Sequence, residues 1–512
     1  MRVILVALSA LALGARLSCS AIEPNALPQG SLTVPASASI HGLNGTYFRS
    51  DLRLLNQSYI DPVTVDLGYT GGGHPGSITL APRETRELRD VVGTFFAAPE
   101  TSGGITIRWS GGPVAASSRT YTDGAAGGTI GTQIPALEDY RSTSAALFVA
   151  LASSGGDLTR GFRSNAGVFN PSYFAAHAST SVTFELFDSL ARPLGVPLTI
   201  EVGGSAQIND IFDALRAGSV VTKNARLVVT SSLPVFPYVT VIDNLSGDSF
   251  YVPAEYTANP SQAARAALYP RIPSPDVVIP AAVSKRGVNG VLFQTDLWLH
   301  NTNSSSSATT LGFTSTEEGV TVRRTVTVTL AALEVRLYEN VVGSLFRAVE
   351  TFGPIHVFQN GFNQPATVFA FSRTYSATPG DKGTIGTEVP ALLGPLSGRF
   401  VFLGIASGGG NAQSGFRTNV GASGYGFPPP NVSLFDSSGT PLGHPVDLYL
   451  PADLPVQVND IFAAAGIPST VTTNAILILD AHGSAVYPYV TVIDNRSSDS
   501  LILAPQVDAS PP

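Results

Sequence analysis

Hydrophobic and polar residues alternate with a period of two in many short segments of the chain. Val182–Asp188 reads VTFELFD, Thr325–Leu330 reads TVTVTL and Tyr238–Asp243 reads YVTVID. Such alternation predicts β-strands with one face turned towards a core. Segments rich in glycine and proline, such as Thr70–Gly76 and Asp436–Gly443, separate these strands and predict tight turns. Short strands with this punctuation indicate an all-β fold of antiparallel sandwiches.

One short helical turn interrupts the strands in each repeated unit. In Asn209–Gly218 (NDIFDALRAG), Ile211, Phe212 and Leu215 form an apolar stripe, Asp210 stands at the N-cap position, and the final glycine ends the turn. We therefore interpret the acidic residue as a helix cap before a catalytic group. Related segments are Asn459–Gly466, with Asp460, and also Leu88–Gly93 and Tyr338–Gly343.

The sequence contains two copies of a long segment. Val235–Ser249 (VFPYVTVIDNLSGDS) returns as Val486–Ser500 (VYPYVTVIDNRSSDS), and Gly128–Leu137 (GTIGTQIPAL) returns as Gly383–Leu392 (GTIGTEVPAL). Two duplicated halves are therefore expected. We interpret the YVTVID strand as the last core strand of a half, conserved between the copies for packing.

Each half divides again into two related units. A hydrophobic residue followed by Pro-Ala begins four segments, at Val34, Ile134, Ile279 and Val389. This layout predicts four tandem immunoglobulin-like β-sandwich units, and we expect the two halves to have separate cores. The predicted boundaries are 1–21 for a signal peptide, 31–127 and 128–253 for the sandwiches of the first half, 254–276 for a linker, and 277–382 and 383–506 for those of the second half.

The first 21 residues have the features of a secretory signal. Arg2 precedes an apolar stretch, Val3–Leu13, and small residues follow up to Ala21. Cys19, the single cysteine of the chain, is an alternative site for a lipid anchor, although Arg16 stands where a lipobox has leucine or valine. We expect a secreted, periplasmic or cell-surface protein whose mature chain has no disulfide.

The composition narrows the partners that the chain can recognise. Of 512 residues, 13% are charged and 44% hydrophobic, the net charge is −8, and only three lysines occur. No basic stripe is present, so we expect no nucleic-acid partner. Beyond the N-terminal signal no apolar stretch has membrane-spanning length, so we expect no transmembrane segment.

The sequence offers no strong motif for chemistry. The seven histidines are scattered without metal-ligand spacing. Gly71–Gly76 (GGGHPG) contains Pro75 and is followed by a strand-like segment instead of the helix that a dinucleotide site needs. Asp243–Asp248 is the nearest approach to a calcium loop, but a plain turn explains it better. We therefore expect no cofactor, no metal and no catalytic site. Recurring arginines are interpreted as structural: Arg49, Arg119, Arg163, Arg373 and Arg417.

Trp298 is the one candidate for a ligand contact. It shares a strand face with Asp296 and His300, opposite the apolar face, where the first unit has Arg53. A tryptophan among hydrogen-bonding groups on an outward face stacks on a sugar ring or a protein partner. The alternative is that Trp298 packs against the linker or the neighbouring sandwich.

The repeat layout and strand pattern of residues 31–505 resemble those of uncharacterised, secreted bacterial proteins built from tandem immunoglobulin-like sandwiches. The resemblance implies architecture more than activity. We expect a non-catalytic extracellular or cell-envelope scaffold for binding, adhesion or spacing, with an extracellular glycan or protein as the partner. The alternatives are a carbohydrate-binding or enzyme-accessory protein and, third, a glycosidase with carboxylates at a domain junction.

Overall fold

The computed structural model describes residues 29–125, 127–256, 277–287, 290–358, 368–451 and 454–509. The predicted signal peptide, Cys19 and nearly all of the predicted linker lie outside these residues. Of the described residues, 61% lie in strands and 5% in helices, and the paired strands run antiparallel, so the predicted all-β, antiparallel class is confirmed. No helix in the described part of the chain is long and apolar enough to cross a membrane.

The first and third sheets have the same strand order. The first sheet is ordered β4-β3-β6-β1-β2-β7-β8, with β5 on β2 and β9 on β1, and the third is ordered β21-β20-β23-β18-β19-β24-β25, with β22 on β19 and β26 on β18. The strands of the first are β1 (Gln29–His41), β2 (Tyr47–Asn56), β3 (Val63–Tyr69), β4 (Gly76–Leu80), β5 (Thr85–Leu88), β6 (Thr101–Ser110), β7 (Val114–Asp123), β8 (Thr129–Pro135) and β9 (Leu137–Glu138). Those of the third are β18 (Val277–Arg286), β19 (Leu292–Asn301), β20 (Ser307–Glu317), β21 (Val320–Leu330), β22 (Val335–Tyr338), β23 (Thr351–Phe358), β24 (Val368–Ala377), β25 (Thr384–Val389) and β26 (Leu392–Leu393).

The second and fourth groups of strands also match each other. In the second, β15 joins the rows β13-β12-β15-β10-β17 and β14-β11-β15-β16; in the fourth, the rows β30-β29-β32-β27-β35 and β31-β28-β33-β34 are separate sheets. The second group contains β10 (Thr143–Ser154), β11 (Phe162–Phe169), β12 (Thr180–Phe187), β13 (Pro193–Val202), β14 (Ser205–Ile208), β15 (Val221–Asp243), β16 (Ser249–Val252) and β17 (Glu255–Tyr256). The fourth contains β27 (Arg399–Gly408), β28 (Phe416–Tyr425), β29 (Asn431–Phe435), β30 (Pro441–Asp447), β31 (Val456–Val458), β32 (Val471–Asp480), β33 (Ala485–Asp494), β34 (Ser500–Leu503) and β35 (Gln506–Val507). We call these four groups units 1 to 4, units 1 and 2 the first half, and units 3 and 4 the second half.

Two predicted unit boundaries fall inside sheets. β8 pairs with β7, from Ser117 opposite Pro135 to Asp123 opposite Thr129, and β25 pairs with β24 in the same way. The GTIGT segments therefore form the second arm of a hairpin in units 1 and 3, and the boundaries predicted at residues 128 and 383 are wrong. Two of the hydrophobic-Pro-Ala segments lie at irregularities within sheets: the pairing of β1 with β6 shifts between Val34 and Ser37, and that of β18 with β23 shifts between Ile279 and Ala282, because the proline has no N–H for the ladder.

The short helices carry the predicted caps. In α2 (Ile211–Ala214) the Asp210 side chain accepts a hydrogen bond from the amide of Asp213, and Asp460 caps α5 (Ile461–Ala464) in the same way. These contacts confirm the interpretation as helix caps. The other helices in the described part of the chain are α1 (Ser172–Ala176), α4 (Val341–Ser344) and the 3-10 turns Leu43–Gly45 and Asp139–Arg141.

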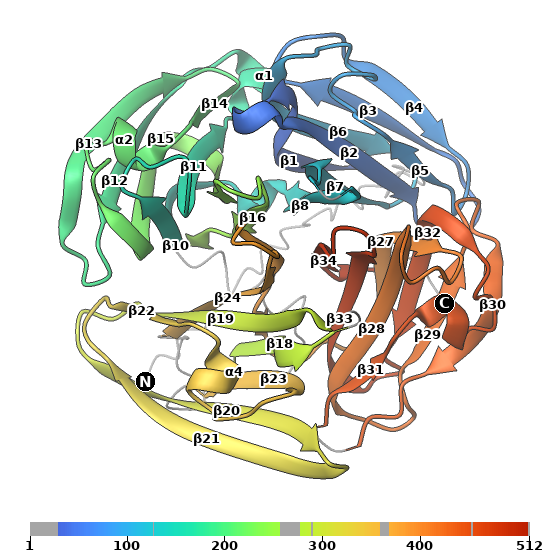
Figure 1. Ribbon diagram of the computed structural model, residues 1–512. Helices are drawn as coiled ribbons and strands as arrows, with labels where there is room; N and C mark the ends of the chain where they lie inside the picture. The colour runs from blue at the N-terminus through green and yellow to red at the C-terminus, as the bar shows by residue number, and fades with distance from the viewer. Residues whose placement is uncertain are drawn as a thin grey trace, which may run out of the picture.

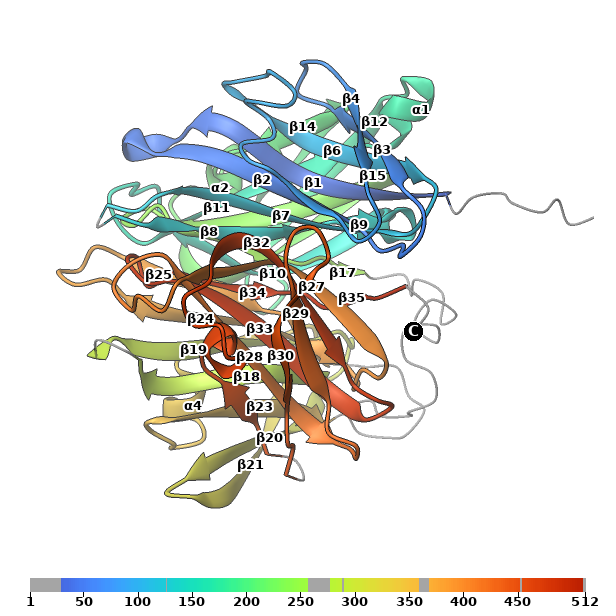
Figure 2. The same ribbon diagram turned by 90° about the vertical axis from the view of Figure 1, so that its right-hand side faces the viewer.

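The four units form a closed ring. They follow one another around a common centre, and strands β8, β16, β25 and β34 meet there (Figure 1). The contacts run from β8 to β16, from β16 to β25, from β25 to β34 and from β34 back to β8. In the side view of Figure 2, β9, β17 and β35 lie on one side of the ring. Each of them pairs near the beginning of the first long strand of its own unit.

Apolar cores cross every boundary between neighbouring units. Tyr238 and Tyr251 of unit 2 pack into the core of unit 1, and Ile502 of unit 4 packs into the core of unit 3. Between the halves, Leu55 and Ala115 of unit 1 share a small cluster with Val401, Leu403, Ile476 and Ile478 of unit 4. Unit 3 contributes Trp298, Val335 and Phe371 to the core of unit 2. The expectation that each half has a separate core is therefore wrong.

Trp298 illustrates this sharing. Its side chain is only 4% exposed, its ring lies 5.5 Å from that of Phe371, and its Nε1 donates to the carbonyl oxygen of Lys223 at 2.9 Å. The sheet face that carries Trp298 was expected to point outward, but unit 2 covers it. Trp298 packs against the neighbouring unit, as the alternative interpretation had it.

Replacing Trp298 with alanine should lower the free energy of unfolding by about 3–5 kcal/mol, because it removes a large buried side chain. Trp298→Phe, which keeps most of the apolar contact and removes the Nε1 bond, should cost about 1–2 kcal/mol. Urea unfolding followed by circular dichroism measures both changes. A loss below about 0.5 kcal/mol for Trp298→Ala would mean that the indole contributes nothing to the interface.

Candidate functional site: the polar centre of the ring

The duplicated segments meet at the centre of the ring as turns. In the turn Asp243–Asp248, the Asp243 amide donates to the Asp248 carbonyl oxygen at 2.8 Å, and Asp243 Oδ1 accepts from the amide of Leu245 at 2.9 Å. The turn Asp494–Asp499 has the same two bonds, from the Asp494 and Arg496 amides, at 2.9 Å each. In each turn, Oδ1 of the first aspartate thus accepts from an amide of the turn itself, and Oδ2 points away from the turn.

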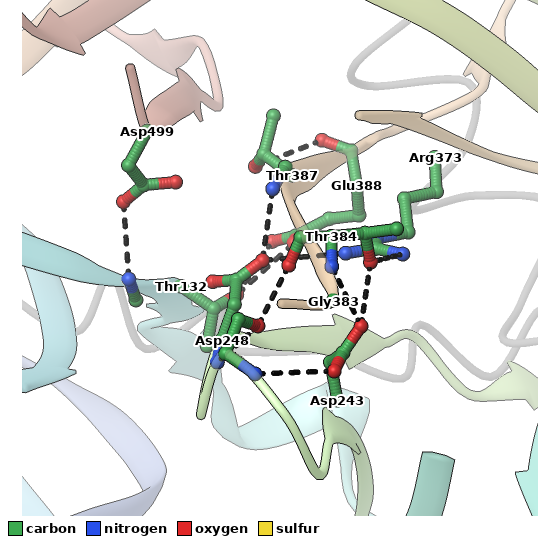
Figure 3. A network of polar contacts seen from close by, with 12 residues as sticks. Thr132, Asp243, Asp248, Arg373, Gly383, Thr384, Thr387, Glu388 and Asp499 are labelled. Carbon is green, nitrogen blue, oxygen red and sulfur yellow. Dashed lines mark hydrogen bonds and ion pairs between the residues drawn. The ribbon is translucent and has the colours of Figure 1, made fainter. Parts of the chain in front are cut away.

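That second oxygen binds the other half of the molecule. Asp243 Oδ2 accepts from both the amide and the hydroxyl of Thr384 in β25, at 2.8 and 2.9 Å (Figure 3). Ser246 Oγ, in the same turn, donates to the Thr384 carbonyl oxygen at 2.7 Å. The turn therefore satisfies both main-chain polar groups of one residue in the β24–β25 hairpin.

Asp248 completes the contact with the same hairpin. Its Oδ2 accepts from the amide of Gly386 at 2.8 Å and from Arg373 Nη2 at 3.3 Å. The hairpin strands approach closely here, since a Cβ on Gly386 would lie 2.2 Å from the Thr374 carbonyl oxygen. A glycine is therefore required at this position.

The second turn makes the same contact with the hairpin β7–β8 of unit 1. Asp494 Oδ2 accepts from the Thr129 amide and hydroxyl at 2.8 and 3.1 Å, Ser497 Oγ donates to the Thr129 carbonyl oxygen at 2.7 Å, and Asp499 Oδ2 accepts from the Gly131 amide at 3.0 Å and from Arg119 at 3.2 Å. We call each set of bonds a turn–hairpin contact. Unit 2 thus binds unit 3, and unit 4 binds unit 1, by one duplicated contact that closes the ring.

A second duplicated contact lies further along the same boundaries. Asn224 Nδ2 donates to the carbonyl oxygen of Val335 at 2.6 Å, and the Val335 amide donates to the carbonyl oxygen of Ser189 at 2.8 Å. At the other boundary the Asn474 side chain donates to the Thr85 carbonyl oxygen at 3.1 Å, and the Thr85 amide donates to the Ser437 carbonyl oxygen at 2.8 Å. Strands β22 and β5 therefore each bind the opposite half with an amide and a carbonyl group.

Burial sets the protonation of the central carboxyl groups. Asp248 and Asp499 are 0% and 1% exposed, and burial raises the pKa of both. Arg373 and Arg119 lower these pKa values again, while the charge of Asp248 raises the pKa of Asp499. Each turn therefore places a carboxylate in a dry site, where an amide and a guanidinium compensate its charge.

Glu388 in β25 is buried at the centre without such an arginine partner. Its carboxyl accepts from the hydroxyl of Thr132, in unit 1, at 3.0 Å, and burial raises its pKa to about 8. The duplicate of Glu388 is Gln133, whose Oε1 accepts from the Ala504 amide at 3.3 Å. A neutral amide in one copy and a carboxyl that stays protonated near neutral pH in the other have the same charge and nearly the same shape.

The three residues predicted to bind a ligand lie at the boundary between units 2 and 3. Asp296 is buried, its Oδ1 accepts from the Asn340 amide at 2.8 Å, and burial raises its pKa. His300 Nδ1 lies 2.7 Å from Glu255 Oε2, with both side chains buried. Asp296 and Trp298 share a pocket of about 70 Å³ with Arg373, whereas His300 does not line it. The outward stacking face predicted for these residues is therefore absent.

The equivalent pocket between units 1 and 4 is larger, at about 180 Å³. Where the first pocket has Trp298, this one has Arg53, whose guanidinium forms an ion pair with Glu87. Opposite them stand Gly404 and apolar residues of unit 4: Leu403, Ala406, Phe416, Val492, Leu501 and Leu503. The boundary between units 1 and 4 thus has the ion pair of Arg53 and Glu87 where the boundary between units 2 and 3 has the aromatic–aliphatic pair Trp298 and Leu337.

Four of the five recurring arginines bind residues of the turns, whereas Arg49 forms an ion pair with Asp123 in β7. Arg163 Nη1 donates to Asn244 Oδ1 at 2.6 Å, and Arg417 donates to Asn495. Together with the pairing of Arg119 and Arg373 to the aspartates, these contacts agree with the structural role predicted for them. Among the described residues, no three His, Cys, Asp or Glu side chains are grouped so that they could hold a metal ion.

The sequence pattern indicates a scaffold role for the turns and does not by itself predict their contact between halves. The sequence feature that indicates this contact is the repetition of polar residues: D-N-x-S-x-D-S and G-T-I-G-T recur in both copies. A core requires apolar residues at a strand, but it does not require the same aspartates and serine in the turn that follows. Repeated polar residues in a loop therefore indicated a contact made twice.

No family model matches this chain, and no curated protein matches it. A solved structure described as "Crystal structure of tetra-tandem repeat in extending region of large adhesion protein" is 11% identical, and the match covers 88% of this chain and 92% of that one. Its TM-score is 0.09. A likeness at this level carries no argument about fold or function.

Replacing Glu388 with glutamine should make the protein less sensitive to alkaline pH. Glu388 keeps its proton in the folded state up to a pH of about 8, whereas in the unfolded chain it loses the proton near its ordinary value of 4.5. The free energy of unfolding therefore falls as pH rises between these values, by about 1.4 kcal/mol per pH unit at most. Glu388→Gln removes this loss, so the variant should gain a few kcal/mol on the wild type from pH 5 to pH 8.

Urea unfolding at several pH values measures this difference, and the reverse change, Gln133→Glu, is the matched control. It adds a second buried carboxyl and should steepen the decline. If Glu388→Gln and the wild type lose stability in parallel between pH 5 and pH 8, Glu388 is not a buried acid that stays protonated.

Proposed function

We propose that this chain is a non-catalytic, secreted or cell-envelope scaffold of four immunoglobulin-like β-sandwiches, which holds loops for binding or adhesion or separates other parts of a surface. The observation that carries the proposal is that the polar groups at the centre of the ring bind one another across the boundaries between the halves. The buried aspartates bind main-chain amides and arginines of the neighbouring half, in two matching copies. Polar groups that bind the neighbouring half in this way favour a structural role, in which they join the units.

A carbohydrate-binding function is the second candidate, and one surface feature favours it. Tyr425, Phe427 and Tyr449 of unit 4 are 57%, 94% and 70% exposed. The two segments that carry them are adjacent, because the Leu448 amide donates to the carbonyl oxygen of Pro430 at 2.8 Å. Exposed aromatic rings stack on sugar rings at low cost in conformational entropy.

The glycosidase alternative has less support. Retaining and inverting glycosidases need two carboxyl groups that face one substrate across a cleft. Asp248, Asp499 and Glu388 line neither of the two pockets described above. Their hydrogen bonds to the opposite half support a structural use instead.

The test measures binding and hydrolysis together. The full chain is incubated with a panel of soluble and insoluble polysaccharides, and both retention and newly released reducing ends are measured. The variant Tyr425→Ala/Phe427→Ala/Tyr449→Ala is compared with a control that removes other exposed apolar side chains, Ile60→Ala/Val221→Ala/Val471→Ala.

Each outcome separates the candidates. Retention that is lost in the aromatic variant and kept in the control supports carbohydrate binding. Absence of both retention and hydrolysis supports a scaffold that binds protein or acts as a spacer. Release of reducing ends by the wild type would contradict the non-catalytic proposal.

A further inference from the structure

Three aromatic rings fill the boundary between units 2 and 3. The ring of Phe371 lies 5.5 Å from that of Trp298 and 6.1 Å from that of Phe250. All three side chains are buried, and they belong to one apolar core that units 2 and 3 share. The pocket that remains beside them measures only about 70 Å³.

The duplicated boundary between units 1 and 4 has no aromatic residue at these three positions. The strand pairings equate Trp298, Phe371 and Phe250 with Arg53, Ser117 and Leu501. The pocket here measures about 180 Å³, and we call it the 1–4 pocket. An apolar cavity of about 150 Å³ inside a protein accepts a molecule of benzene. The 1–4 pocket therefore has room for one ring and a small polar group.

The 1–4 pocket has one apolar wall and one polar wall. Unit 4 supplies the apolar residues named above, and unit 1 supplies Arg53, Ser118 and Arg119. Arg89 also lines the pocket, and its side chain is 67% exposed, so the pocket reaches the surface there. A molecule that fits both walls must combine an apolar body with a polar group.

Two atoms of the polar wall lack a hydrogen-bond partner, whereas the side chains at the equivalent positions are bonded. Arg53 Nε and Ser118 Oγ are both buried, and neither has a partner in the described part of the chain. At the other boundary, Trp298 Nε1 donates to a main-chain carbonyl oxygen at 2.9 Å, and Ser372 Oγ donates to another at 3.0 Å. A buried polar atom without a partner costs free energy, so Arg53 and Ser118 would stabilise an acceptor in the 1–4 pocket.

The charges around the 1–4 pocket favour an anion. Among the described residues, three guanidinium groups line it, whereas the carboxyl groups that line it are those of Asp51 and Glu87. Arg119 is paired with an aspartate of the turn, and Arg53 and Arg89 share the carboxylate of Glu87. Burial raises the pKa of Asp51, which favours its neutral form. A carboxylate in the pocket would therefore compensate positive charge and accept charge-assisted hydrogen bonds.

We propose that the 1–4 pocket binds a small carboxylate whose apolar body has the size of about one ring. In this complex the carboxylate accepts hydrogen bonds from Arg53 Nε and Ser118 Oγ, and the ring lies against Leu501 and Leu503 of unit 4. The exposed aromatic residues of unit 4 do not line this pocket, so the binding does not depend on a carbohydrate. Because the ligand contacts both units, its binding should also raise the melting temperature.

The experiment titrates the full chain with benzoate and, separately, with benzamide, and measures the heat of binding. Benzoate combines one ring with a carboxylate, and benzamide has nearly the same shape without the charge. We expect saturable binding of benzoate with a Kd of about 0.1–1 mM, which is ordinary for a ligand of this size. Benzamide should bind roughly tenfold more weakly, because it loses the charge-assisted bonds.

A matched pair of serine variants locates the site. Ser118→Ala removes a hydroxyl that has no partner in the protein, so it should weaken benzoate binding roughly threefold to tenfold and leave the melting temperature unchanged. Ser372→Ala, at the equivalent position, removes a hydroxyl that is bonded within the protein. It should lower the melting temperature and leave the affinity for benzoate unchanged.

Two further variants test the volume and the charge of the 1–4 pocket. Ser117→Phe introduces the residue of the second half and should abolish benzoate binding, with a single melting transition as evidence that the variant folds. Arg53→Met should remove the preference for benzoate over benzamide. The proposal is overturned if the wild type shows no saturable binding of benzoate, if benzamide binds as tightly, or if neither Ser118→Ala nor Ser117→Phe weakens the binding.

Discussion

The ring depends on four aspartates that are buried against the main chain of a neighbouring unit. A carboxylate in a dry interior loses several kcal/mol of hydration unless donors replace the water. Asp248 and Asp499 each receive one backbone amide and one guanidinium, and Asp243 and Asp494 each receive the amide and hydroxyl of a threonine. Because all these donors belong to the opposite half, a misaligned contact would leave buried acceptors unpaired. That penalty makes the contact selective for one geometry.

The duplicated boundaries show two solutions to the same packing problem. Unit 1 places the ion pair of Arg53 and Glu87 beside Gly404, and unit 3 places Trp298, whose strand partner is Leu337, beside Ala150. A buried ion pair offsets its desolvation only with good geometry, whereas an aromatic–aliphatic pair of similar volume gains from burial directly. The ion-paired boundary has the larger pocket and the aromatic one the smaller. The turn–hairpin contact is retained in both copies, whereas these side-chain pairs vary between them.

Local features of the fold could be predicted from the sequence, and its closure could not. Period-two alternation identified strands such as Val182–Asp188, and Asp210 identified a helix cap, because both depend on neighbouring residues. The face of Trp298 was assigned to solvent, since alternation distinguishes the two faces of a strand but does not reveal that another unit covers the second one. Contacts between Asp248 and Gly386 join distant segments, and only the repetition of their polar letters carried any trace of them.

The central claim is that the turn–hairpin contacts and the shared cores make the four units one cooperative structure. Differential scanning calorimetry of the full chain tests this claim most directly. The account predicts a single transition whose van't Hoff enthalpy equals the calorimetric enthalpy, because neither half keeps its core or satisfies its buried carboxylates alone. Two resolved transitions, each with the enthalpy of one half, would show that the halves fold independently and would contradict the account.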